Sequence, residues 1–366
     1  MDGELKGLIK VCLSVLASLS YCHFIVSKIP KGKLRLLFLV PILCIFTLLP
    51  SLLSSVHLTA GSCFLITWLA NFKLILFAFD QGPLASHPPK SFLSFVSIAF
   101  LPIKIKHDVD VPSPTNNLNL KYCKSNPSPP HFTKGKSGTK SPLKNLSIKA
   151  LLYAILLRIY DYKQYLHRNL VITLYCCHVF LLLEFLLAPA AFLARALLGQ
   201  ELEPQSDEPY LSTSLQDFWG RRWNLMVTSI LRPTVYDPMR SLSERVFGRK
   251  WASLPAVLAA FLVSALMHEL IYYYATRAAP TGEVTCFFLL HGVCTALETV
   301  VKNAVKGRLQ LHRAISRALT LGFVVATAVW LLFPPLVRNG TDTTAIWESR
   351  AVIAFVKEKL ELRIEN

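Results

Sequence analysis

The sequence has few charged residues for its length. Of its 366 residues only 17% are charged, whereas 53% are hydrophobic, and the mean hydropathy is +0.43. An ordinary soluble domain carries about 25% charged residues. The charges gather in a few segments, and between them lie apolar runs of about 20 residues, the length that a helix needs to cross a bilayer. These features exclude a soluble globular domain and predict an all-α, polytopic transmembrane helical bundle.

Several patterns of known chemistry are also missing. The nine cysteines include no CxxC pair, so neither a zinc site nor a disulfide framework is indicated. No cluster has the spacing of metal ligands, and we expect no metal and no resident cofactor. No Gly-x-Ser-x-Gly elbow or His-x-x-x-x-Asp box occurs, which leaves a covalent serine route without support. An internal repeat, common in transporters, is absent as well.

The apolar runs predict about eight membrane spans in a single integral membrane domain of residues 1–366. The predicted spans are 8–27, 34–54, 60–79, 148–166, 170–198, 254–276, 283–301 and 318–337. Three loops, near 28–35, 104–149 and 302–317, are strongly basic. Because Lys and Arg concentrate in cytoplasmic loops, these three belong on the cytosolic side. All three loops lie on the cytosolic side only if 148–166 crosses the membrane. The N-terminus is then luminal.

Net charge and the polar segments fit the same interpretation. The net charge of +17 is explained by topology and by contact with anionic lipid or an anionic substrate, so no nucleic-acid partner is predicted. Residues 107–147 are rich in Pro, Ser, Asn and Lys and predict a flexible basic cytosolic loop. The tail 341–366 has apolar residues at helical spacing between charges, as in an interfacial helix.

His268 lies deep inside the apolar run that ends in LMHELIYYY. An ionisable residue at this depth costs at least about 2.5–3.5 kcal/mol when charged, so it is a functional candidate. Ser264, Ile271 and Tyr272 share its helical face. The alternative is a histidine that only hydrogen-bonds to a neighbouring helix.

The following span carries a second polar stripe. His291, Thr295 and Glu298 recur at positions that face one side of a helix. This pattern is typical of helix–helix hydrogen bonding. We treat His291 and Glu298 as a possible secondary polar site.

Between the predicted fifth and sixth spans the chain reads SLQDFWGRRWN. Trp219 and Trp223 flank the adjacent arginines Arg221 and Arg222, and Asn224 follows. Guanidinium groups bind phosphate in a bidentate fork, so the segment suits an anionic head group at the cytosolic surface. The alternative is an ordinary interfacial belt with basic anchors.

Together these residues predict acyl transfer. A neutral His268 acts as general base toward a hydroxyl, whose oxygen attacks a thioester carbonyl. Asn224 donates to the developing oxyanion or holds the reacting groups in place. Arg221 and Arg222, with Trp219 and Trp223, bind acyl-coenzyme A, which enters as a co-substrate.

At this point the chain resembles a known family. SLQDFWGRRWN, the intramembrane histidine of LMHELIYYY and PTGEVTCFFLLHGVCTALE, taken in order, resemble the membrane-bound O-acyltransferase superfamily. KIPKGKLRLLFLVPI and NFKLILFAFDQGPL are similar to its plant wax synthase branch, the long-chain-alcohol O-fatty-acyltransferases. The resemblance implies an enzyme of the endoplasmic reticulum membrane with His268 as catalytic histidine and Asn224 as its partner.

We therefore predict that the enzyme makes wax esters from acyl-coenzyme A and a long-chain fatty alcohol, and that membrane lipids contact it. The branch is not uniform, so a sterol O-acyltransferase or a diacylglycerol acetyltransferase with the same site stays open. Outside enzymes, a lipid or ion transporter that uses His268, His291 and Glu298 as a relay is the alternative.

Overall fold

The computed structural model describes residues 2–86, 91–104, 142–199, 202–305 and 311–364. Every element of secondary structure in these ranges is a helix, as the hydropathy pattern predicts. Seven of the described helical stretches are long and apolar enough to cross a membrane. They are Gly3–Lys28, Lys33–Leu52, Val56–Ala78, Arg168–Leu197, Ser253–Thr276, Glu283–Val305 and Arg313–Arg338.

Several of these stretches are composite. The first stretch joins α1 to η1, the second α2 to η2, the third α3 through η3 to α4, and the last α14 through η8 to α15. The bounds are α1 Asp2–Phe24, η1 Val26–Lys28, α2 Lys33–Leu48, η2 Leu49–Leu52, α3 Val56–Ser62, η3 Cys63–Ala70, α4 Asn71–Ala78, α8 Arg168–Leu198, α12 Ser253–Thr276, α13 Glu283–Val305, α14 Arg313–Thr327, η8 Ala328–Leu332 and α15 Pro334–Arg338.

The shorter helices connect or flank these spans. Their bounds are α5 Pro83–Ser86, α6 Phe92–Phe100, α7 Pro142–Ile159, η4 Tyr160–Tyr165, η5 Pro209–Leu211, α9 Leu215–Asp217, η6 Phe218–Arg222, α10 Leu225–Leu231, η7 Arg232–Tyr236, α11 Asp237–Trp251 and α16 Thr341–Ile364. The predicted C-terminal helix is therefore observed as α16.

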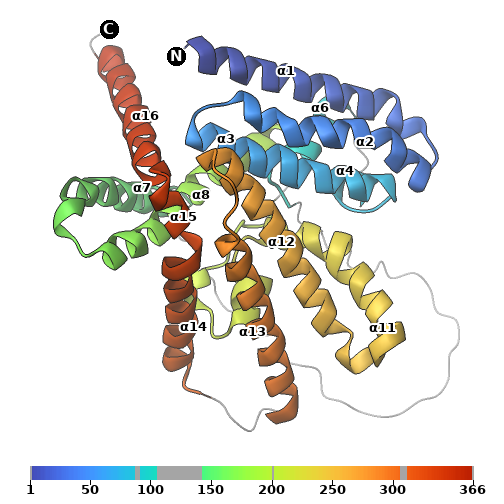
Figure 1. Ribbon diagram of the computed structural model, residues 1–366. Coiled ribbons are helices and arrows are strands. Elements are labelled where there is room, and N and C mark those ends of the chain that lie inside the picture. Colours follow the sequence, from blue (N-terminus) through green and yellow to red (C-terminus); the bar gives the residue numbers. More distant parts are fainter. Residues whose placement is uncertain (1, 87–90, 105–141, 200–201, 306–310, 365–366) are drawn as a thin grey trace, which may run out of the picture.

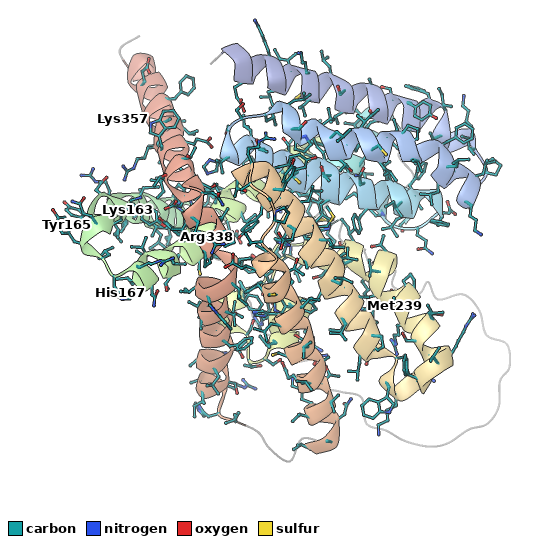
Figure 2. The ribbon with its side chains drawn as sticks, in the orientation of Figure 1. Lys163, Tyr165, His167, Met239, Arg338 and Lys357 are labelled. Atoms are coloured by element: carbon teal, nitrogen blue, oxygen red, sulfur yellow. The ribbon has the colours of Figure 1, made fainter. Side chains whose placement is uncertain are left out.

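The predicted fourth span, 148–166, differs from the expectation. Its helix α7 begins at Pro142 and gives way at Tyr160 to the 3₁₀ turn η4, and it is not among the seven stretches that qualify by length and composition. α7 nevertheless pairs antiparallel with α8, since Lys149 bonds Glu184 whereas Tyr160 packs on Tyr175. Figure 2 shows Lys163, Tyr165 and His167 at the turn between them. Its role as an eighth span stays a prediction.

The predicted loop 107–147 lies mostly outside the described residues. Residues 142–147 are described and belong to α7, so the helix begins inside the segment that was predicted to be a loop.

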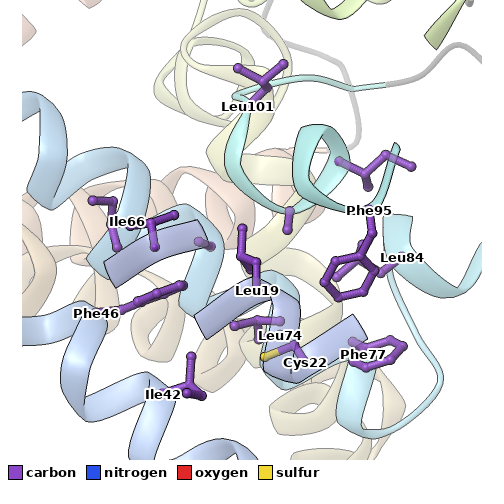
Figure 3. Packing of buried hydrophobic residues seen from close by; sticks show 14 of the residues in the cluster. Leu19, Cys22, Ile42, Phe46, Ile66, Leu74, Phe77, Leu84, Phe95 and Leu101 are labelled. Atoms are coloured by element: carbon purple, nitrogen blue, oxygen red, sulfur yellow. The ribbon is translucent and has the colours of Figure 1, made fainter. Parts of the chain in front are cut away.

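Most of the spanning helices form two groups, as Figure 1 shows, with α7, α8 and α16 beside them. α1, α2 and α4 run side by side with α6 behind them, and α12, α13 and α14 form a second layer that crosses below. Leu19, Phe46 and Leu74 are buried in the core of the first group, part of which Figure 3 shows. A second core contains Leu157, Phe287 and Ala328, from α7, α13 and η8.

A third, smaller core joins the two groups. Trp68 from η3 and Met226 from α10 are buried in it, and Met267 of α12 packs against them. This junction brings the middle of the third stretch against α12, where Trp68 contacts His268.

Gly292 lets α13 pack tightly against α12. A Cβ added at this position would lie 2.9 Å from the Cβ of Phe261 on α12. Small residues at such crossings let helix backbones pack tightly, which is a main source of association in a bilayer.

We expect Gly292→Ala to destabilise the protein by about 1–3 kcal/mol, because the methyl group overpacks the α12–α13 contact. Thermal unfolding in detergent, followed by size-exclusion chromatography of the surviving monodisperse peak, measures this. Gly322→Ala on α14 is the matched control, since nothing lies within 4 Å of its added Cβ. Equal melting temperatures for both variants would refute the tight crossing.

Glu348 of α16 fastens the C-terminal helix to the start of α3. Its carboxylate accepts hydrogen bonds from the backbone N–H groups of Val56 and His57, at 2.8 and 3.0 Å, and from the Ser55 hydroxyl at 2.9 Å. It also pairs with the His57 ring at 2.6 Å. Burial alone raises the pKa of this carboxyl, but the hydrogen bonds from His57, Val56 and Ser55 outweigh it and leave the pKa below its usual range.

The depressed pKa predicts an acid-dependent loss of stability. The carboxylate stabilises the fold above its unfolded pKa of about 4.3, and this contribution is lost as pH falls through the lower folded value. Glu348→Gln should therefore melt earlier than the wild type at pH 7, with the gap closing below about pH 4. Glu358→Gln, exposed on the same helix, is the control and should show no gap at either pH.

Candidate active site

His268 lies in the interior of α12, between two rings contributed by other helices. Its imidazole stacks on Phe288 of α13, with centroids 4.2 Å apart, and meets the edge of Trp68 at 5.1 Å. Phe288 and Trp68 are both buried. The imidazole therefore lies in an apolar slot between Trp68 of the third qualifying stretch and Phe288 of the sixth, and its ring stacks on that of Phe288.

The hydrogen bonding of His268 selects its tautomer. Nδ1 lies 2.8 Å from the carbonyl oxygen of Ser264, one turn earlier in the same helix. Because a carbonyl only accepts, Nδ1 carries the proton, and the neutral ring leaves its lone pair on Nε2. No hydrogen bond to Nε2 occurs among the described residues. Such a nitrogen is free to take a proton from a bound hydroxyl.

Asn224 occupies a strained turn at the start of α10. Its backbone is left-handed, with φ 41° and ψ 66°, and its side-chain oxygen accepts a hydrogen bond from the N–H of Val227 at 3.2 Å. This bond fixes the side-chain oxygen as the N-terminal cap. The amide NH₂ group, which has two protons, is consequently the part of Asn224 that is available to donate.

A strap of residues 203–207 holds this turn from both sides. The N–H of Asp207 donates to the carbonyl of Arg222 at 2.9 Å, and the N–H of Leu225 donates to the carbonyl of Gln205 at 2.8 Å. Ser206 in turn donates to Glu184 of α8 at 2.6 Å. These residues were not predicted, because backbone pairing of this kind has no signature in the side chains.

The two predicted arginines have different surroundings. Arg222 is engaged within the protein: its Nε donates to Asp217 at 3.0 Å and its Nη1 to the carbonyl of Asp207 at 3.0 Å. Arg221 is exposed. The structure therefore favours Arg221 alone as the free cation of the pair, and Arg222 as a brace of the segment.

The two tryptophans build an aromatic cluster rather than a surface belt. Trp223 stacks on Phe218, with centroids 5.5 Å apart and planes 12° from parallel. Trp219 packs against Phe288 at 6.0 Å and donates its Nε1 proton to Nδ1 of His291 at 3.0 Å.

The polar stripe of α13 holds the same segment at its other end. Glu298 accepts from the backbone N–H groups of Leu215 and Gln216, at 2.9 and 3.3 Å, and pairs with Lys302. His291 and Glu298 thus contact the segment 214–224 and are not brought together with each other by any described hydrogen bond.

Asn224 and His268 both lie beside the third, smaller core, but no described hydrogen bond joins them. Met226 and Val227, which follow Asn224, pack in the small core of Trp68, and Trp68 contacts His268. Trp68 and Phe288 were not predicted, because buried aromatics in apolar runs look the same whether or not they line a site.

These features define a membrane-embedded site with a basic nitrogen that no described residue occupies, a free amide donor and the exposed cation Arg221. A family model described as the membrane bound O-acyl transferase family matches residues 202–290, which include both Asn224 and His268. A long-chain-alcohol O-fatty-acyltransferase of Simmondsia chinensis is 44% identical over 361 residues, which cover 98% of each chain.

Two proteins of Arabidopsis thaliana extend the comparison. A probable long-chain-alcohol O-fatty-acyltransferase 1 is 44% identical over 98% of each chain, and an acyl-CoA–sterol O-acyltransferase 1 is 42% identical over 97% of each chain. The chain therefore belongs to the membrane-bound O-acyltransferase family, and it is a multi-pass membrane enzyme. Within that family it falls in the plant wax synthase branch, as its motifs predicted.

The different surroundings of the arginines generate a prediction. Arg222→Ala should lower protein stability, because it leaves Asp217 and the carbonyl of Asp207 without their partner, at a cost of about 1–3 kcal/mol. Arg221→Ala should leave stability unchanged and raise the KM for the acyl donor. Melting in detergent and initial rates at varied acyl donor measure the two effects. The reverse assignment of effects would show that Arg222 is the ligand-binding cation.

Proposed function

We propose that this enzyme transfers a fatty acyl group from acyl-coenzyme A to a long-chain alcohol, giving a wax ester and free coenzyme A, in the endoplasmic reticulum membrane. The observation that carries the proposal is the geometry of His268: its imidazole lies between Phe288 and Trp68, Nδ1 bonds the carbonyl of Ser264, and no described residue bonds Nε2. The 44% identity to a long-chain-alcohol O-fatty-acyltransferase supports the acceptor.

The reaction requires two proton movements at His268. Nε2 removes the proton of the alcohol hydroxyl as its oxygen attacks the thioester carbonyl. The NH₂ of Asn224 donates to the oxyanion that develops on the carbonyl. As the C–S bond breaks, the imidazolium returns the proton to the departing thiolate, so the histidine ends in its initial state.

The apolar surroundings suit this chemistry. An imidazole without water competing for Nε2 remains neutral and ready to accept a proton, and ester formation is protected from hydrolysis. In this proposal the exposed Arg221 pairs with the phosphates of coenzyme A, which stay outside the apolar slot.

Replacement of His268 tests the proposal directly. His268→Ala should lower the rate of ester formation by about 10²–10⁴-fold, the range that general-base catalysis supplies. Microsomes that contain the variant, incubated with labelled acyl-coenzyme A and a long-chain alcohol, provide the measurement. His167→Asn, an exposed histidine at the turn before α8, is the control and should keep the wild-type rate. Near-normal turnover by His268→Ala would refute the general base.

The sterol is a second candidate acceptor, because the sterol O-acyltransferase relative is nearly as similar, at 42% identity. Parallel incubations with a long-chain alcohol, with a sterol, and with diacylglycerol plus labelled acetyl-coenzyme A separate the alternatives by product. We expect wax ester as the main product. A sterol ester or acetylated glyceride in greater yield would move the assignment to that acceptor without changing the site.

A further inference from the structure

His291 is the most completely enclosed polar group near the site. Its side chain has an exposed fraction of 0%. Nδ1 accepts the Trp219 indole proton at 3.0 Å, and Nε2 lies 2.8 Å from the hydroxyl of Thr327. That hydroxyl gives its own proton to the carbonyl of Phe323 at 2.7 Å, so Nε2 is the donor to Thr327. Both ring nitrogens are therefore occupied.

This saturation separates His291 from the proton-transfer chemistry. A general base needs a free lone pair within reach of the substrate hydroxyl. His291 has none, because its lone pair is on Nδ1 and is bound to Trp219. His268 has the opposite arrangement, since its only described hydrogen bond is to its own helix. An effect of His291 on the reaction must consequently pass through the groups that it holds.

Trp219 is the group through which His291 reaches the site. Its ring contacts Phe288, with centroids 6.0 Å apart, and Phe261 of α12 at 5.7 Å. Phe288 in turn stacks on His268 at 4.2 Å. A shift of Trp219 would therefore release one face of the ring against which the imidazole of His268 rests.

The same tryptophan also fixes the approach to Asn224. Its carbonyl accepts a hydrogen bond from the hydroxyl of Thr228 on α10 at 3.3 Å, so Trp219 is tied to the helix that Asn224 caps. A single hydrogen bond between Trp219 and His291 thus orients both halves of the site against α13.

We propose that His291 is a positioning residue for acyl transfer: by holding Trp219 against Phe288 it fixes the plane of the His268 imidazole and the turn of Asn224. The proposal rests on the proposed role of His268 as general base. Misplacement of a reacting group by about 1 Å can cost a hundredfold in rate. The described contacts of the Trp219 ring are to the protein, and the proposed contact of the acyl donor is Arg221, so binding of the donor should change little.

The test uses four variants of the full-length enzyme in microsomes. His291→Leu removes the acceptor and Trp219→Phe removes the donor but keeps a ring. His291→Asn restores an acceptor near the place of Nδ1, and Thr327→Val removes only the partner of Nε2. We expect His291→Leu and Trp219→Phe to lower kcat about ten- to a hundredfold with KM for the acyl donor almost unchanged.

Two further results distinguish this from a structural role. His291→Asn should recover most of kcat. The double variant of His291→Leu with Trp219→Phe should be no slower than the slower single variant, because both remove one shared interaction. Thr299→Val is the matched control on α13, since its hydroxyl bonds only within the helix, to Thr295 at 2.9 Å, and it should keep wild-type kinetics.

A readout that does not need turnover keeps this test separate from the proposed function. Diethyl pyrocarbonate modifies neutral imidazole nitrogen, and mass spectrometry of the peptide gives the rate at His268. That rate should change severalfold in His291→Leu and stay at the wild-type value in Thr299→Val. If the wild type forms no ester, the proposed function fails. The modification rate of His268 still shows whether His291 fixes the position of the His268 imidazole.

Other outcomes would overturn the proposal. These are a wild-type kcat in folded His291→Leu, a loss that appears in KM with kcat unchanged, and additive losses in the double variant. If His291→Leu does not accumulate in the membrane, Trp219→Phe decides, and an unchanged kcat there refutes the link.

Discussion

A polar side chain inside a bilayer must find its hydrogen-bond partner within the protein, because lipid offers none. In this structure, intramembrane polar side chains therefore form hydrogen bonds that join one segment to another. Lys73, fully buried in α4, donates to the carbonyls of Ile98 and Leu101 at the end of α6. Glu269 of α12 accepts from the N–H and hydroxyl of Thr285 on α13, at 3.0 and 2.9 Å. Each bond fixes the register of two elements whose apolar faces would allow sliding.

His268 departs from this rule. Its one described hydrogen bond goes to its own helix, so it fastens nothing, and its second nitrogen is unbound. Placing an ionisable side chain in an apolar slot costs free energy, and His268 does not offset this cost by joining helices. A chemical role therefore explains its presence better than a structural one. His291 shows the contrast, since it joins α13, η6 and α14 through two bonds.

The frame around the site comes from the strap 203–207 and from the hairpin of α7 and α8. The strap 203–207 pairs with the backbone on both sides of Asn224, and it is anchored to α8 through Ser206 and Glu184. Glu184 is itself paired with Lys149 of α7 at 2.7 Å. The helical hairpin of α7 and α8 therefore supports the turn that presents the amide of Asn224, although it contributes no predicted catalytic residue.

Much of the fold could be predicted from the sequence, since hydrophobic runs of bilayer length leave helices as the only spanning structure of this kind. Seven of the predicted spans are matched by qualifying helices of the described residues. The fourth, 148–166, stays a prediction, because its helix α7 carries charges such as Lys149, which pairs with Glu184 of α8, and it does not qualify by length and composition. The family and the positions of Asn224 and His268 were also readable, as short motifs in a fixed order.

The sequence by itself determined that this chain is a helical membrane acyltransferase, because hydropathy sets the spans and local motifs identify the family. Only the tertiary structure decided what each polar residue does. Arg221 and Arg222 are adjacent and chemically equal in the sequence, yet one is exposed and the other is bound to Asp217. His268 and His291 are both histidines in apolar helices, and they differ in whether a partner from a distant segment occupies the lone pair. That difference depends on contacts between residues far apart in the chain, which a local pattern does not contain.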